Sequence, residues 1–248
     1  MVSASLALIT LLLAAAPAAD TRNYCGIYSS ADRILELHRG PEGALRGYVR
    51  DGERIAALSP IDVRDGALHA SATYDDGTKA ELTAAVKPGP VLALEGREYR
   101  LDAVEKPADA AVRREIEEAY SRLAKAVETK NYEAFQALRV PDFATIPPNG
   151  TPSPASRMAE RTRGMLERIQ PPITNRNDIL ELTTRGDHAI ATVRQFFERI
   201  QLVEGSPHTI HTEVTQRETW TRTAQGWKLL FVDEVRDPLT LDNGRRVQ

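Results

Sequence analysis

The sequence predicts an α+β fold, in which a small all-β meander domain precedes a cone-shaped domain with three helices on a curved antiparallel sheet. Short apolar runs separated by turn dipeptides such as Asp-Gly fill residues 24–105, which is typical of a meander. A one-sided apolar stripe with a period of 3.6 residues predicts a helix over 110–129. Long segments rich in strand-forming residues then run from about 179 to 236 and predict the sheet.

The N-terminus predicts export. Residues 6–16 are apolar and small residues follow, which is typical of a secretory signal peptide, residues 1–19, cleaved near Ala19. The run is short for a membrane span, so we expect an exported protein, periplasmic or extracellular, with no membrane span after signal removal. A retained N-terminal anchor is the alternative. Cys25 is the only cysteine, which excludes an intrachain disulfide and a cysteine-based metal site.

Composition and motifs exclude several classes of function. The formal net charge of -3 argues against nucleic acid as a partner, because no basic excess exists to neutralise phosphates. No Gly-rich phosphate loop or nucleophile elbow occurs, and we expect no cofactor. We also expect no metal: His38 and His69 lack a third ligand at a recognisable spacing, and His208 and His211 would point to opposite faces of a strand.

In the β-domain, residues 24–105, we expect a meander that forms a small barrel or a curved sheet, serving as structural support or as a platform for a partner. The predicted strands are 34–38, 45–49, 67–74, 80–86, 91–94 and 99–104. Residues 106–109 are a predicted linker.

The cone domain, residues 110–236, begins where Asp109 can cap the first helix. Asn131 opens a second, short helix, and Ser153-Pro154 opens a third that ends at Pro171. Strands are predicted at 143–146, 179–184, 189–201 and 209–221, followed by the strand that closes the final hairpin, and residues 237–248 read as a polar tail.

The final hairpin carries the predicted ligand site. If Arg222 pairs with Trp227, period-two alternation places the even-numbered residues of one strand and the odd-numbered residues of the other on one inner face, and five of these side chains form the predicted ligand site. They are Gln216, Glu218, Trp220, Phe231 and Asp233. Carboxylates among aromatic rings are costly unless they are hydrogen-bonded, protonated or beside a wet cavity, so Glu218 and Asp233 are also candidates for proton transfer. The alternative is that Asp233 lies in water and Glu218 pairs with an arginine such as Arg194.

Residues 110–236 resemble the SnoaL-like, nuclear-transport-factor-2-like (NTF2-like) superfamily. The resemblance is carried by Lys130–Phe135 after the first helix, by Pro141–Ala144, and by Thr219–Arg222 with Gly226–Leu229. It implies a cone whose sheet encloses a cavity open at one end, into which the predicted inner face would look. Ketosteroid isomerases resemble this fold, but Leu123 stands at their tyrosine position and the base position falls near Pro148. Of the three residues that act in those enzymes, only the late-strand acid has a counterpart here, near Glu218. Because the other two are missing, the comparison argues against a steroid-isomerase mechanism.

Three hypotheses about function follow. The first is a cone that binds a small apolar or amphipathic molecule without catalysis. The second is an enzyme that moves a proton with Glu218 or Asp233. The third is a structural or homodimeric interaction module, suggested by Leu230 and Val232 on the predicted outer face of the sheet.

Overall fold

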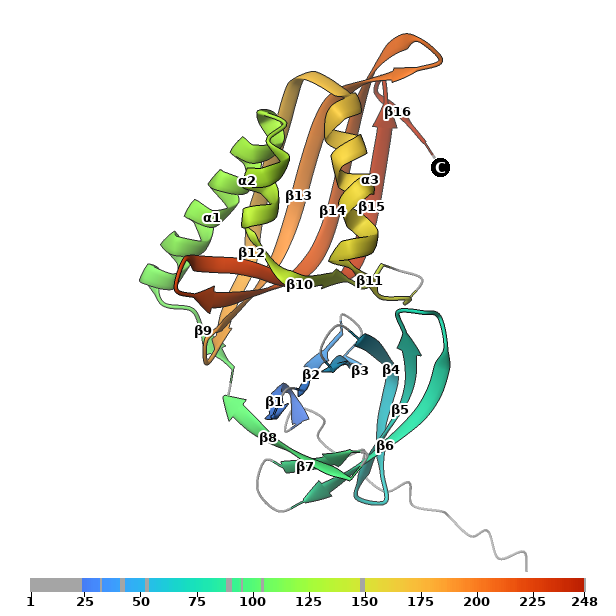
Figure 1. Cartoon of the computed structure of the whole chain (residues 1–248), viewed down its shortest axis with the longest axis vertical. Coiled ribbons are helices and arrows are strands. Elements are labelled where there is room, and N and C mark those ends of the chain that lie inside the picture. The colour runs from blue at the N-terminus through green and yellow to red at the C-terminus, as the bar shows by residue number, and fades with distance from the viewer. Residues whose placement is uncertain are drawn as a thin grey trace, which may run out of the picture.

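The computed structural model describes residues 24–31, 33–40, 43–51, 54–87, 91–94, 96–103, 105–147 and 150–247. The predicted signal peptide lies outside these residues. Figure 1 shows two parts, a barrel of strands and a unit of helices on a long sheet, with the barrel at one end of the helix–sheet unit. None of the helices in the described ranges combines the length and the apolar character that crossing a bilayer requires.

The N-terminal part is a closed barrel of eight antiparallel strands. Each strand pairs with the next, and β1 pairs with β8. The strands are β1 (Gly26–Ser30), β2 (Arg33–Arg39), β3 (Leu45–Asp51), β4 (Arg54–Arg64), β5 (Ala67–Tyr74), β6 (Lys79–Lys87), β7 (Val91–Leu94) and β8 (Arg97–Ala103).

The predicted fold class is therefore wrong. The protein is mostly sheet, with 65% strand and 19% helix, and its N-terminal part is a closed barrel rather than a small meander beside a three-helix cone. The prediction missed β1 and β4, the two strands that complete the ring. Closure pairs every strand on both sides and removes the open edges that a meander would leave.

Side chains fill the barrel interior. Alternate residues such as Leu35, Leu37 and Leu68 point inward and form one buried cluster. The hollow left among them has a volume of about 20 Å³, which is room for about one water molecule. The barrel is thus a packed support rather than a container.

The helix–sheet unit has α1 (Ala110–Glu128), α2 (Tyr132–Ala137) and α3 (Ala155–Arg168) on one side of its sheet (Figure 1). Asp109 caps α1 as predicted, because its carboxylate accepts hydrogen bonds from the backbone N–H groups of Ala111 and Val112. The apolar stripe of α1 is buried against the sheet, with Ile116 and Leu123 in the core.

The sheet runs in the order β11-β10-β15-β14-β13-β12-β9, and β16 pairs with β15. Its strands are β9 (Lys106–Pro107), β10 (Arg139–Thr145), β11 (Ser153–Pro154), β12 (Ile169–Arg185), β13 (His188–Val203), β14 (Ser206–Thr223), β15 (Gly226–Asp242) and β16 (Arg245–Arg246). Residues 106–107, inside the predicted linker, pair with β12, and residues 237–242, inside the predicted tail, continue β15.

The β14–β15 hairpin first departs from the predicted register between Trp220 and Thr219. Arg222 pairs with Trp227 and Trp220 with Leu229 as predicted, but Thr219 then pairs with Phe231. Leu230 is therefore an extra residue in β15, a β-bulge. Because side chains alternate with period two, this insertion turns Phe231, Val232 and Asp233 to the faces opposite the predicted ones, and further irregularities in the pairing follow between Arg217, Thr215 and Glu213.

The two faces of the sheet consequently pack against different parts of the protein, one against the helices and the other against the barrel. Trp220, Leu229 and Val232 pack into the core under the helices. Phe231 faces the barrel, where its ring centroid lies 4.0 Å from that of Tyr48. Leu230 belongs to the same barrel-side cluster, so the prediction that Leu230 and Val232 lie on an exposed outer face is wrong.

Gly47 on β3 allows β2 to approach closely. A Cβ atom at this position would meet the backbone carbonyl oxygen of Glu36 well inside contact distance. Because the obstructing atom is backbone, a rotamer change cannot relieve the clash.

We predict that Gly47→Ala lowers the free energy of unfolding by about 3 kcal/mol, the upper part of the range for overpacked sites. Urea unfolding followed by circular dichroism measures it. Gly164→Ala in α3 is the matched control, because a Cβ there meets only the flexible end of Arg168 and alanine favours helix. Equal stability of Gly47→Ala and wild type would contradict the close approach.

Candidate functional site

A buried cluster of ionisable side chains joins the barrel to the sheet, and Arg217 of β14 is at its centre. One end of the Arg217 guanidinium pairs with Glu36 of β2, and Nη1 lies 3.3 and 3.4 Å from the two carboxylate oxygens of Asp233 on β15. The exposed fractions of Glu36, Asp233 and Arg217 are 0%, 5% and 6%. A guanidinium removed from water in this way needs carboxylates on both sides.

Glu36 is held ionised by its surroundings. The Tyr48 hydroxyl donates a 2.6 Å hydrogen bond to one carboxylate oxygen, and Arg185 Nη1 lies 3.8 Å from the other. Burial by itself raises the pKa of Glu36, but the charges of Arg217 and Arg185 outweigh it and lower that pKa to about 2. Glu36 is therefore a carboxylate across the physiological pH range.

His38 extends the cluster along β2, because residues two apart on a strand point to the same face. Its Nε2 lies 3.0 Å from Glu234 Oε1 and 3.3 Å from Asp233 Oδ2. Burial raises the pKa of Asp233, and the charges of Arg217 and His38 only partly oppose the rise. For Glu234 burial also raises the pKa, but the hydrogen bond and charge of His38 lower it below its usual range. We call Glu36, His38, Arg185, Arg217, Asp233 and Glu234 the ion cluster.

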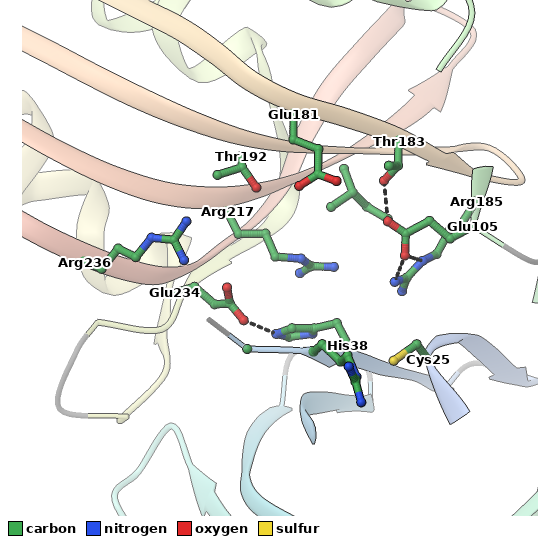
Figure 2. Close-up of a pocket in the computed structure, with 13 residues that line it drawn as sticks. Cys25, His38, Glu105, Glu181, Thr183, Arg185, Thr192, Arg217, Glu234 and Arg236 are labelled. Carbon is green, nitrogen blue, oxygen red and sulfur yellow. Dashed lines mark hydrogen bonds and ion pairs between the residues drawn. The ribbon is translucent and has the colours of Figure 1, made fainter. Parts of the chain in front are cut away.

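A hollow of about 520 Å³ opens beside the ion cluster, between the barrel and the sheet; we call it the junction pocket. Figure 2 shows charged and hydroxyl side chains pointing into it from both parts of the protein. Its size is typical of small-molecule sites. Its lining comprises Cys25, His38, Arg39, Gly40, Glu105, Glu181, Thr183, Arg185, Ile190, Thr192, Arg217, Glu234 and Arg236.

Several of the lining charges already have partners. Glu105 pairs with Arg185 and accepts a 2.6 Å hydrogen bond from the Thr183 hydroxyl. Burial raises the pKa of Glu105, but Arg185 and Thr183 outweigh it and lower that pKa. These paired side chains form part of the pocket wall, and their charges are already satisfied within the protein.

Other lining groups remain available. Glu181 and Thr192 are cross-strand neighbours on β12 and β13, and Thr192 is opposite Arg217 on β14. In Figure 2 the side chains of Glu181 and Thr192 point into the space above Arg217. Among the described residues neither forms a hydrogen bond or ion pair, and Arg236 has only Asp237, 4.0 Å away. The pocket thus offers an acceptor, a hydroxyl and a cation.

Glu218 lies on the other side of the sheet, under the helices, with an exposed fraction of 1%. Its carboxylate accepts hydrogen bonds from the Tyr120 hydroxyl at 2.7 Å and from Gln216 Nε2 at 2.6 Å. Trp220 Nε1 donates to the Tyr120 oxygen at 3.2 Å. Burial raises the pKa of Glu218, while these hydrogen bonds and the charge of Arg139 act against the rise.

The five residues predicted as one ligand site therefore lie on two faces. Gln216, Glu218 and Trp220 are on the helix side, whereas Phe231 and Asp233 are on the barrel side. Sequence reasoning missed Glu36 and His38, although both alternate with inward-facing leucines in β2 and so must share the outer face of that strand. It also gave no role to Arg217, which the structure shows to be buried.

No protein-family model and no curated protein matches this sequence. Solved structures do match in fold. An NTF2-like protein from Streptomyces avermitilis has 13% identity and a TM-score of 0.43, with 51% of this chain and 96% of that chain covered. An NTF2-like superfamily protein from Salmonella enterica has 20% identity and a TM-score of 0.42, with 51% and 91% covered. The protein Kfla4162 from Kribbella flavida has 18% identity and a TM-score of 0.44, with 52% and 95% covered.

These structural neighbours are consistent with an NTF2-like domain in one part of the chain, about half of its length. The resemblance predicted from the sequence is confirmed to that extent. The neighbours bear on the fold alone, and the chemistry of any site must come from the residues of this chain.

We predict that Glu36→Gln lowers the free energy of unfolding at pH 7 by about 3 kcal/mol, because it leaves the buried Arg217 charge without its barrel partner. The lowered pKa of Glu36 determines how this stability difference depends on pH. The ionised carboxylate stabilises the fold above its ordinary pKa of 4.5, and this contribution is lost as the pH falls toward about 2. The difference between wild type and variant should therefore shrink between pH 5 and pH 2.5.

Urea unfolding at several pH values measures this difference. Glu118→Gln on the exposed side of α1 is the matched control and should change stability by less than about 0.5 kcal/mol. A difference that stays constant with pH would show that Glu36 does not act through its charge.

Proposed function

We propose that the protein is exported and binds, without catalysis, a small polar molecule that carries both a positive and a negative group. The observation that supports this proposal best is the junction pocket, a hollow of about 520 Å³ with unpartnered Glu181 and Thr192 facing its interior. Glu181 is the acceptor for a cationic group, and Arg236 is the donor for an anionic group. The Thr192 hydroxyl lies between them in the sheet order and can donate or accept.

The charge balance of the pocket supports a zwitterion over a simple ion. The lining holds four arginines and three glutamates, and Glu36 and Asp233 stand directly behind Arg217. A ligand with only negative charge would be repelled by this set of carboxylates, and one with only positive charge by the arginines. A molecule with both groups can satisfy the two available side chains at once.

The polar walls also change our prediction about the ligand. The sequence favoured an apolar or amphipathic molecule in the cone, next to Glu218 and Trp220. Both side chains are buried in the packed core under the helices. The junction pocket lies on the opposite face of the sheet, so we propose a polar ligand there instead.

Proton transfer is the second candidate function, and one observation favours it. Burial raises the pKa of both Glu218 and Asp233, which is the usual way in which a carboxyl group is prepared for acid or base chemistry. Glu218 has its hydrogen-bond partners inside the core, and Asp233 is paired with Arg217. These contacts give both residues a structural role, which is why we place binding first.

Export rests on the signal-like residues 6–19 of the sequence. Intact mass spectrometry of the protein isolated from its source tests it. A chain that begins close after Ala19 supports export with cleavage, and a full-length chain supports the retained anchor.

We predict that binding of a free amino acid raises the unfolding temperature of the wild-type protein, and that Glu181→Gln and Arg236→Gln each weaken the binding about tenfold. One lost charge-assisted hydrogen bond accounts for a change of this size. A thermal-shift screen of the twenty free amino acids and glycine betaine identifies the ligand class, and calorimetry of the best ligand gives the affinities. Acetate and butylamine test whether a single charge is enough.

The controls are Glu118→Gln and Arg161→Gln, which change the same residue types at exposed helical positions outside the pocket. Both should bind as the wild type does. If Glu218→Gln abolished binding while Glu181→Gln left it intact, the ligand would lie in the cone and the proposal would fail.

A further inference from the structure

A second hollow, of about 530 Å³, lies between α1, α2 and the turn of the β14–β15 hairpin. We call it the cationic groove. It is open because small side chains, Ala126 on α1 and Ala134 and Ala137 on α2, stand where larger ones would fill the space. The other lining residues are Arg122, Lys125, Thr129, Asn131, Leu138, Gln225, Trp227 and Lys228.

The floor of the cationic groove is apolar and fixed. Trp227 and Leu138 are buried, with exposed fractions of 4% and 8%. The Trp227 indole N–H donates a 2.7 Å hydrogen bond to Glu115 on α1, and the backbone N–H of Leu229 donates to the Leu138 carbonyl at 2.8 Å. These two hydrogen bonds attach the hairpin to α1 and to the end of α2. They fix the positions of the elements that border the hollow.

The rim carries positive charge, and Glu115, the carboxylate that contacts the floor, is already bonded to the Trp227 indole N–H and to Arg222. Arg122, Lys125 and Lys228 all line the groove, and no aspartate or glutamate does among the described residues. Within the same part of the chain Arg122 and Lys125 have no side-chain partner, and Lys228 Nζ donates only to the neutral Gln225 Oε1, at 2.6 Å. Three cations together are notable in a chain whose formal net charge is -3.

An apolar floor with a cationic rim selects a ligand of matching shape and charge. We propose that the cationic groove binds a small anionic amphiphile, a molecule with one carboxylate headgroup and an alkyl chain of medium length. The headgroup lies among Arg122, Lys125 and Lys228, and the chain covers Trp227 and the alanines. The groove shares no residue with the junction pocket, so this inference is independent of the proposed function.

Nuclear magnetic resonance of the ¹⁵N-labelled full chain tests the proposal, with sodium decanoate below its micelle concentration as the probe. The two indole N–H signals report the site. The Trp227 signal should move on titration because its ring forms the floor, and the Trp220 signal should stay in place because that ring is fully buried under the helices.

Two variants separate the contributions of charge and space. Arg122→Glu with Lys125→Glu should raise the dissociation constant for decanoate at least tenfold. Ala134→Leu keeps every charge but fills the groove, and should abolish the Trp227 shift. Arg161→Glu on the exposed face of α3 is the charge-reversal control and should leave the affinity unchanged.

Other probes test the ligand class. Decanol, which keeps the chain and loses the charge, should bind at least tenfold more weakly than decanoate, and so should acetate, which keeps the charge and loses the chain. An unchanged Trp227 signal, equal binding of decanol, or equal weakening by Arg161→Glu would each overturn the proposal. So would a hexaglutamate peptide that binds as tightly as decanoate, because it would show a site for acidic peptides.

Discussion

The burial of the Arg217 guanidinium is the constraint on which the junction of the two parts depends. An arginine in the middle of a sheet can leave water only if carboxylates replace its hydration. Asp233 on the neighbouring strand supplies one, and Glu36 on the barrel supplies the other. Because one of the two counter-charges comes from the barrel, docking of the barrel both removes Arg217 from water and supplies the carboxylate that replaces its hydration. The ion cluster therefore links the docking of the two parts to the pairing of their charges.

The β-bulge at Leu230 makes this arrangement possible. Without the extra residue, Asp233 would face the helices beside Glu218, and two carboxylates would share a core that offers few cations. With it, Asp233 stands next to Arg217 and Phe231 packs on Tyr48. One inserted residue thus divides the hairpin between an apolar core on the helix side and a charged junction on the barrel side.

Local features of the fold could be predicted from the sequence. Which face of each strand packs against which part of the protein could not. The cap at Asp109, the pairing of Arg222 with Trp227 and the resemblance to an NTF2-like domain each depend on a few neighbouring residues. The bulge has no signature, since Leu230 is one apolar residue in an apolar run. Barrel closure depends on β1 meeting β8, whose paired residues, such as Ile27 and Ala103, are more than seventy positions apart in the sequence.

The junction pocket also depends partly on local sequence and partly on contacts between distant elements. Alternation in β2 places Glu36 and His38 on one face, but no local pattern states which surface that face will meet. The pocket is polar because it forms between the outer face of a barrel strand and the outer face of the sheet, the two sides that do not supply a core. A ligand held there would contact both parts at once, through Glu181 and Arg236 on the sheet and near His38 on the barrel. Its binding energy would add to that of the ion cluster, and occupancy of the pocket would stabilise the docking of the barrel on the sheet.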